Sequence, residues 1–198
     1  MERGEGFSTA YEEALRLAVV AHRQQKRKGN GLPYIIHPIH VSVILLRHGF
    51  STEAAIAGLL HDVVEDQDYE LAEITQQFGP RVGEMVDILS ERKRNDRGER
   101  RPWVVRKRET IERMETASRE TMAVKAADTL HNAHSFSEDL RREGAELWRH
   151  FNRGPQHQLD YYRSIVELSE KHLGRHPLVE ELIGAVDRLA QAIDETAS

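Results

Sequence analysis

The feature that most constrains this chain is an apolar run, residues 54–60, that leads directly into His-Asp-Val-Val-Glu-Asp at residues 61–66. If the stretch is one helix, Asp62, Glu65 and Asp66 share one face, because residues three and four apart are helix neighbours. A solvated helix end is the usual explanation for a single acid. It does not suit a cluster inside an apolar helix, where unpaired buried carboxylates are very unfavourable. The stretch therefore predicts a compensating cation, and a divalent metal ion meets that requirement.

Composition limits both the class of protein and the kind of metal site. The 198 residues suffice for one sizeable core and are few for two. The chain has no cysteine and eleven histidines, so a metal site must use imidazole and carboxylate. A net charge of −5 argues against general nucleic-acid binding. No apolar stretch approaches the ~20 residues of a membrane span, and residues 1–7 lack the apolar region of a secretory signal. We therefore expect a soluble, cytoplasmic protein.

Helical periodicity and helix-end signals run through the chain, without strand-type alternation. Ser8 or Thr9 caps the first predicted helix, and Ser51 caps the helix that carries the acidic cluster. Pro38 suits the first position of a helix, which places His37 beside its N-cap. Further helices are predicted within residues 71–78, 82–89, 120–136, 147–151, 159–173 and 177–193. The pattern predicts an all-α fold of about eight to ten helices.

The last predicted helix is amphipathic, and its apolar face admits two kinds of packing. Its apolar positions are Leu178, Leu182, Val186, Leu189 and Ile193. Such a face packs either on the core of the same chain or on a second subunit, which leaves a homo-oligomer open. We expect one domain over residues 1–198, with a core at about 8–174 and the terminal amphipathic helix within 175–198.

Residues 91–108 form a strongly basic stretch, with nine lysines or arginines against three acids. The stretch predicts a flexible loop followed by a helix that begins at Pro102. Two interpretations remain open, a solvated loop and a lid that attracts a polyanionic small molecule. Nucleic-acid binding is the weaker interpretation, because the basic segment is single and the whole chain is acidic.

Asp128 lies among small apolar residues of the helix predicted within residues 120–136. Lys125 precedes it by three positions, and Asn132 follows it by four. A solvent-exposed Lys125–Asp128 pair would contribute less than about 1 kcal/mol. The apolar surroundings instead favour an interior role for Asp128.

Four motifs, in this order along the chain, resemble those of a known family. They are Arg27-Lys28, Pro33-Tyr34-Ile35-Ile36-His37-Pro38, His61-Asp62-Val63-Val64-Glu65-Asp66 and Val124-Lys125-Ala126-Ala127-Asp128-Thr129-Leu130-His131-Asn132. The histidines and aspartates resemble the ligand set of HD-domain phosphohydrolases. The neighbouring residues are similar to the hydrolase domain of the RelA/SpoT family, above all to its single-domain members, the small alarmone hydrolases or Mesh-type proteins.

The resemblance implies an HD-domain helical bundle that holds one Mn²⁺ ion, although Zn²⁺, Fe²⁺ or Co²⁺ would also suit such ligands. It implies His37, His61, Asp62 and Asp128 as metal ligands, and Glu65 and Asp66 as the acidic pair that handles the attacking water. It implies nucleotide contacts from Arg27, Lys28, Asn132 and Tyr161, the last stacking near the base or ribose. The implied reaction is hydrolysis of the 3′-pyrophosphate of ppGpp or pppGpp to GDP or GTP plus pyrophosphate.

Departures from the family pattern leave other functions open. Gln67 stands where the family often has threonine, and Ala126 replaces its usual leucine. The same chemistry on an adenine alarmone or on the 2′-phosphate of NADPH is a second interpretation, because base choice depends on pocket shape. A catalytically silent metal- or nucleotide-binding module is a third. The intact pair of Glu65 and Asp66 argues against the third interpretation.

Overall fold

Helices make up nearly all the regular structure of this protein. The computed structural model describes residues 8–28, 30–67, 69–150 and 154–197. In these residues, β pairing is limited to two isolated bridges. The elements are α1 (Thr9–Ala21), α2 (Ile36–Arg47), α3 (Thr52–Leu60), α4 (Val63–Asp66), α5 (Leu71–Phe78), α6 (Pro80–Leu89), α7 (Trp103–Glu115), α8 (Arg119–Glu143), the 3₁₀ helix η1 (Gly144–His150), α9 (Pro155–Leu173) and α10 (Pro177–Ala197). The all-α prediction is confirmed, and no helix in the described part of the chain has the length and apolar character needed to cross a membrane.

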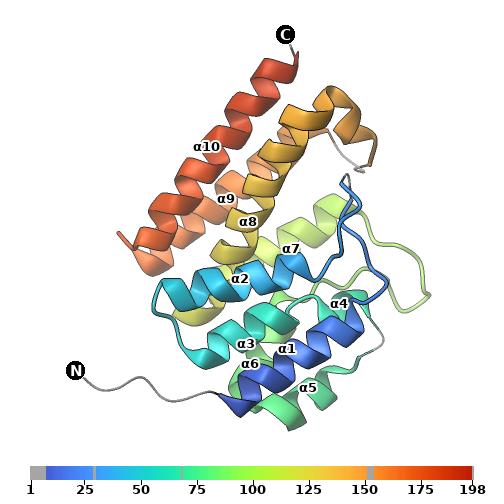
Figure 1. Ribbon diagram of the computed structural model, residues 1–198, viewed down its shortest axis with the longest axis vertical. Helices are drawn as coiled ribbons and strands as arrows, with labels where there is room; N and C mark the ends of the chain where they lie inside the picture. The colour runs from blue at the N-terminus through green and yellow to red at the C-terminus, as the bar shows by residue number, and fades with distance from the viewer. Residues whose placement is uncertain (1–7, 29, 68, 151–153, 198) are drawn as a thin grey trace.

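Helix α8 connects the two halves of the molecule. It packs against α9 and α10 on one side and against α2, α3 and α6 on the other. In Figure 1, α8, α9 and α10 run alongside one another in the upper part, while α1, α3, α5 and α6 lie in the lower part. Residues on the inner face of α8 therefore meet side chains from both halves.

Helices α2 and α3 approach closely because α3 presents small residues to its partner. A Cβ atom at Gly58 would lie only 2.9 Å from Leu45 Cδ1 and 3.2 Å from Val41 Cγ1, so a larger residue would force these α2 side chains to shift. The close approach brings the start of α2 beside the end of α3. The rings of His37 and His61 consequently lie with their centroids 5.3 Å apart.

Several predicted helix boundaries differ from the structure; α8 and α9, for example, extend beyond the predicted 120–136 and 159–173. The helix expected to run through the acidic cluster is interrupted, with His61 and Asp62 in a turn between α3 and α4. The His61 imidazole donates to the Gly58 carbonyl, the group that the Asp62 N–H would use in a continuous helix. Helix α2 begins two residues before Pro38. The predicted helix over 147–151 overlaps the 3₁₀ helix η1, and Phe151 lies outside the described residues.

The apolar face of α10 packs inward on α8 and α9. The five apolar positions identified from the sequence are all buried: Leu178, Leu182, Val186, Leu189 and Ile193. Of the two packings left open by the pattern, the structure has the one on the core of the same chain. This face therefore needs no second subunit to cover it.

We expect Leu182→Ala to lower the free energy of unfolding by about 2–5 kcal/mol, because it leaves a cavity where a fully buried side chain stood. Thermal unfolding at two protein concentrations measures the effect. Asp187→Ala, at an exposed position of the same helix, is the control and should change little. A loss of stability that appears only at low protein concentration would contradict packing within one chain.

Candidate active site

Three of the predicted ligand residues, from three parts of the fold, converge on one buried point. His37 on α2, His61 after α3 and Asp128 on α8 have ligand atoms within 4.8 Å of one another. Each residue is at most 8% exposed. Nε2 of His37 lies 3.2 Å from Asp128 Oδ1, and Nε2 of His61 lies 3.9 Å from the same oxygen. Two imidazoles and a carboxylate arranged in this way could hold a divalent metal ion.

Asp62, the fourth predicted ligand, reaches the same imidazoles. Its Oδ2 lies 3.0 Å from His61 Nε2 and 3.8 Å from His37 Nε2. That oxygen also accepts a hydrogen bond from the Tyr34 hydroxyl at 2.5 Å. The fold thus brings the four residues together, and the role of each as a metal ligand stays a prediction.

Hydrogen bonds on the far sides of the two imidazoles leave both Nε2 atoms facing the cluster. Nδ1 of His61 donates to the Gly58 carbonyl at 2.8 Å, and Nδ1 of His37 lies 2.8 Å from Nδ1 of His131. Within the described residues, the buried Nε2 of His61 makes no well-aligned hydrogen bond, although Asp62 Oδ2 lies 3.0 Å away. A cation bound between them would satisfy both the nitrogen and the carboxylate.

The charges around the cluster also favour a cation. Burial opposes protonation of His61, but the Asp62 and Asp128 carboxylates outweigh it and raise the pKa of His61 to about 9. Burial by itself would raise the pKa of Asp128, whereas Lys125 and the two imidazoles hold that pKa well below its usual value. Lys125 Nζ lies 2.7 Å from Asp128 Oδ2, and both residues are buried, so this pair is interior rather than solvent-exposed.

We expect Tyr34→Phe to weaken Mn²⁺ binding about 10–100-fold, the usual effect of losing a group that orients a ligand. The substitution removes only the hydroxyl that binds Asp62. Calorimetric titration with Mn²⁺ measures the affinity. Tyr11→Phe is the matched control, because its hydroxyl bonds Ser42 instead. Equal affinities in both variants would show that metal binding does not depend on this contact.

Glu65 and Asp66, the predicted acidic pair, line a cavity next to the cluster. Glu65 Oε2 accepts the backbone N–H of Glu91 at 2.8 Å, and Asp66 Oδ2 accepts Gln25 Nε2 at 2.7 Å. Burial and the Asp62 charge raise the pKa of Glu65, although Lys93 opposes them. A buried carboxyl group with a raised pKa is suited to accepting a proton.

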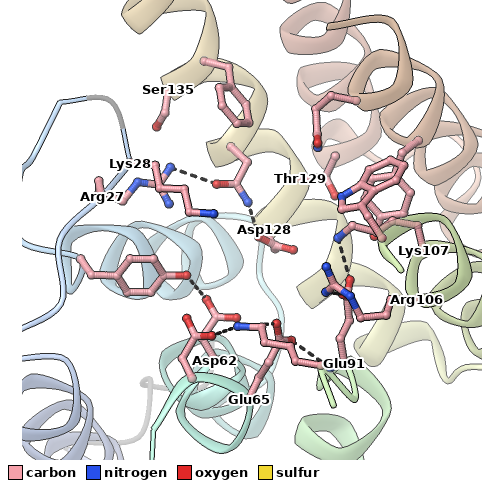
Figure 2. Close-up of a pocket in the computed structure, with 18 of the residues that line it drawn as sticks. Arg27, Lys28, Asp62, Glu65, Glu91, Arg106, Lys107, Asp128, Thr129 and Ser135 are labelled. Carbon is pink, nitrogen blue, oxygen red and sulfur yellow. Dashed lines mark hydrogen bonds and ion pairs between the residues drawn. The ribbon is translucent and has the colours of Figure 1, made fainter. Parts of the chain in front are cut away.

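The cavity has a volume of about 430 Å³ and joins this acidic region to a wall of cations. Its cationic lining comprises Lys26, Arg27, Lys28, Lys93, Arg100, Arg106, Lys107 and Lys125. Figure 2 shows Arg27 and Lys28 on one side of the cavity and Asp62 and Glu65 on another. Burial and the positive charges of Arg100 and Lys93 lower the pKa of Lys28, because cations from separate segments face the same space. This space therefore fits a ligand with several negative charges.

The four predicted nucleotide contacts, Arg27, Lys28, Asn132 and Tyr161, all line this cavity. Arg27 Nη2 donates to Asn132 Oδ1 at 3.0 Å, and Asn132 Nδ2 donates to Asp128 Oδ1 at 2.6 Å. Asn132 thus links the predicted phosphate-binding arginine to the metal cluster. The hydroxyl of Tyr161 is buried and makes no hydrogen bond within the described residues.

The basic stretch contains functional candidates that the sequence reasoning missed. Helix α7 begins at Trp103, directly after the predicted start at Pro102. The carboxylate of Glu91 is buried and pairs with Arg106 and, at 2.6 Å, with Lys107. Lys107 Nζ lies 4.4 Å from the centre of the Tyr161 ring. The run of basic residues pointed to this region, but no local sequence pattern connects Glu91 to Arg106 and Lys107 on α7.

The HD domain family matches residues 14–155, and the chain therefore belongs to the HD-domain family. The human guanosine-3′,5′-bis(diphosphate) 3′-pyrophosphohydrolase MESH1 is 38% identical over 139 residues, which cover 69% of this chain and 72% of the relative. The Xenopus tropicalis MESH1 is 33% identical over 171 residues, covering 85% and 87%. These similarities confirm the resemblance carried by the four motifs.

Other relatives are much longer proteins. A GTP pyrophosphokinase of Streptomyces coelicolor is 37% identical over 138 residues, 68% of this chain, but the chain spans only 16% of that relative's length.

Two solved structures share the fold. A crystal structure of a Listeria monocytogenes protein has a TM-score of 0.66 and 35% identity, covering 76% of this chain and 96% of that one. A metazoan ortholog of SpoT, which hydrolyses ppGpp, has a TM-score of 0.64 and 28% identity, covering 98% and 96%. The second likeness extends over nearly the whole chain.

Proposed function

We propose that this protein is a metal-dependent phosphohydrolase that converts ppGpp or pppGpp to GDP or GTP plus pyrophosphate. The observation that carries the proposal is one cavity in which an acidic pair faces a cationic wall, with Asp128 of the His-His-Asp cluster in its lining. The substrate carries phosphates on both the 3′ and the 5′ oxygen of its ribose. A site for it therefore needs a reaction centre at the 3′-diphosphate and cations that bind the 5′-phosphates. The MESH1 relatives, named for this activity, support the proposal.

We propose a bound Mn²⁺ ion with four protein ligands: His37, His61, Asp62 and Asp128. When bound, the ion would supply a Lewis acid that lowers the pKa of a water molecule and polarises a phosphoryl oxygen. The mixed nitrogen and oxygen ligands suit Mn²⁺ and would also accept Zn²⁺, Fe²⁺ or Co²⁺. The two carboxylates would balance the charge of the ion.

Glu65 and Asp66 orient the attacking water and accept its proton, a role that accelerates hydrolysis by about 10²–10⁴-fold. The water oxygen bonds to the phosphorus attached to the ribose 3′ oxygen, and the bond between that phosphorus and the 3′ oxygen breaks. Pyrophosphate leaves with the water oxygen, while the ribose oxygen gains a proton that balances the one taken from water.

The cationic wall holds the remaining phosphates and the nucleoside. Arg27 binds phosphate through its forked donors, and Lys28 acts as a compact charge. Asn132 keeps the Arg27 guanidinium in place beside the cluster. Tyr161 provides an aromatic surface for the base or ribose.

Parallel incubation of the purified protein and Mn²⁺ with ppGpp, ppApp and NADPH, followed by chromatography of the products, tests the proposal. We expect pyrophosphate and GDP from ppGpp. Preferred turnover of ppApp or NADPH would assign the same chemistry to another nucleotide. If folded, metal-bound protein acts on none of the three, the enzymatic proposal fails and a binding module takes its place.

A further inference from the structure

Lys93 contacts both carboxylates that the proposed function assigns to the attacking water. Its Nζ lies 3.0 Å from Glu65 Oε1 and forms an ion pair with Asp66 Oδ1. The lysine comes from the basic stretch between α6 and α7 and lines the cavity. Its side chain is 40% exposed, so the ammonium group remains accessible to a ligand. The proposed function counts this cation only as one member of the cationic wall and gives it no part in the reaction itself.

The ammonium group of Lys93 has a donor to spare. A lysine carries three N–H donors. In the described parts of the chain, Glu65 and Asp66 are the acceptors that it contacts. The third N–H is therefore left for the cavity. Lys93 also contributes, after burial and Arg100, to lowering the pKa of Lys28, which lines the same cavity.

The position of Lys93 places a positive charge beside the reacting phosphorus. A water molecule held by Glu65 or Asp66 lies about 2.6–3.2 Å from a carboxylate oxygen. The ammonium group of Lys93 binds the same two carboxylates. Oxygens of a phosphoryl group that this water attacks are therefore within reach of Lys93.

We propose that Lys93 is a further catalytic residue whose ammonium group contacts the 3′-diphosphoryl group during hydrolysis. The inference rests on the proposed function. As the water oxygen bonds to phosphorus and the bond to the ribose 3′ oxygen breaks, negative charge gathers on the phosphoryl oxygens. Lys93 stabilises that charge and keeps its own proton throughout.

Hydrolysis of ppGpp by three variants tests the proposal: Lys93→Met, Lys93→Arg and Arg97→Met. We expect Lys93→Met to lower kcat about 100-fold, as loss of one donor to developing negative charge does. Lys93→Arg should restore most of the rate because it restores the charge. Arg97→Met is the matched control, since Arg97 is an exposed residue of the same loop outside the cavity. Wild-type kcat in Lys93→Met, with an unchanged melting temperature, would overturn the proposal.

Binding of inorganic pyrophosphate separates direct contact from an effect transmitted through Glu65. With Mn²⁺-loaded protein, we expect Lys93→Met to weaken pyrophosphate binding about tenfold or more, with GDP affinity unchanged. Equal pyrophosphate affinity in wild type and Lys93→Met would overturn the contact even if kcat falls. This measurement requires no turnover, so it remains decisive if the wild type fails to hydrolyse ppGpp, a result that would overturn the proposed function instead.

A substrate with a 3′-diphosphate and no 5′-phosphates locates the contact. The fall in kcat on Lys93→Met should persist with this substrate, because the proposed contact is with the 3′ group. If the fall disappears, Lys93 serves the 5′-phosphates and the proposal is wrong.

Discussion

Asp62→Ala is expected to abolish metal binding and hydrolysis together. The substitution removes a carboxylate that lies 3.0 Å from His61 Nε2 and 3.8 Å from His37 Nε2. We expect the affinity for Mn²⁺ to fall by more than about 100-fold. This exceeds the loss of affinity that follows removal of a residue that only orients a metal ligand. The value of kcat/KM should fall by more than about 10³-fold, because the metal supplies several kcal/mol of transition-state stabilisation. Metal analysis and turnover on the same sample measure both effects.

The fold is expected to survive this substitution. The Asp62 side chain is 15% exposed, and its removal frees the Tyr34 hydroxyl at the edge of the cavity. Asp187→Ala, which removes an exposed carboxylate outside the cavity, controls for net charge. If the Asp62 variant keeps both full metal occupancy and wild-type turnover, the ligand assignment is wrong.

Glu65→Gln is expected to keep the metal and lose turnover. The amide preserves the size of the side chain and an oxygen that can accept the Glu91 N–H, but it cannot take a proton from water. We expect kcat to fall about 10²–10⁴-fold, with Mn²⁺ affinity close to that of the wild type. Steady-state kinetics and calorimetric titration separate these effects.

The experiment includes two further variants. Asp66→Asn changes the other acid of the pair, and Glu84→Gln is the control. Glu84 is exposed on α6 and does not line the cavity, so its variant should behave as wild type. The larger loss of kcat between the Glu65 and Asp66 variants identifies the residue that accepts the proton. Wild-type rates for Glu65→Gln would place the base elsewhere.

The helical class and the chemistry of the site followed from local patterns. Helical periodicity, capping residues and glycine or proline breaks act over a few positions, so they predicted the helices without knowledge of the fold. Three carboxylates and one imidazole at residues 61–66, next to an apolar run, predicted a cation, because burial of charge is unfavourable in any fold. The family resemblance added His37 and Asp128 to the implied ligand set, and the structure brings His37, His61 and Asp128 within 4.8 Å of one another.

Contacts between distant segments could not be predicted in this way. Tyr34 binds Asp62 across 28 positions, and Glu91 binds Arg106 across 15. The basic stretch, residues 91–108, is a further example, and its role as a lid stays a prediction. Arg94 and Arg97 are exposed, as expected of a solvated loop, while Lys93 reaches the acidic pair in the cavity.

The sequence by itself determined the all-α class and the need for a cation at residues 61–66, because both depend on spacing and on the energetics of buried charge, while its resemblance to a family implied the remaining site residues. Only the tertiary structure decided that α10 covers its own core, since an amphipathic face has the same pattern whether its partner belongs to the same chain or to another. It also decided that α3 ends before Asp62 and that Lys93 meets Glu65 and Asp66. These outcomes depend on which surfaces meet when the helices pack, and no local pattern contains that information.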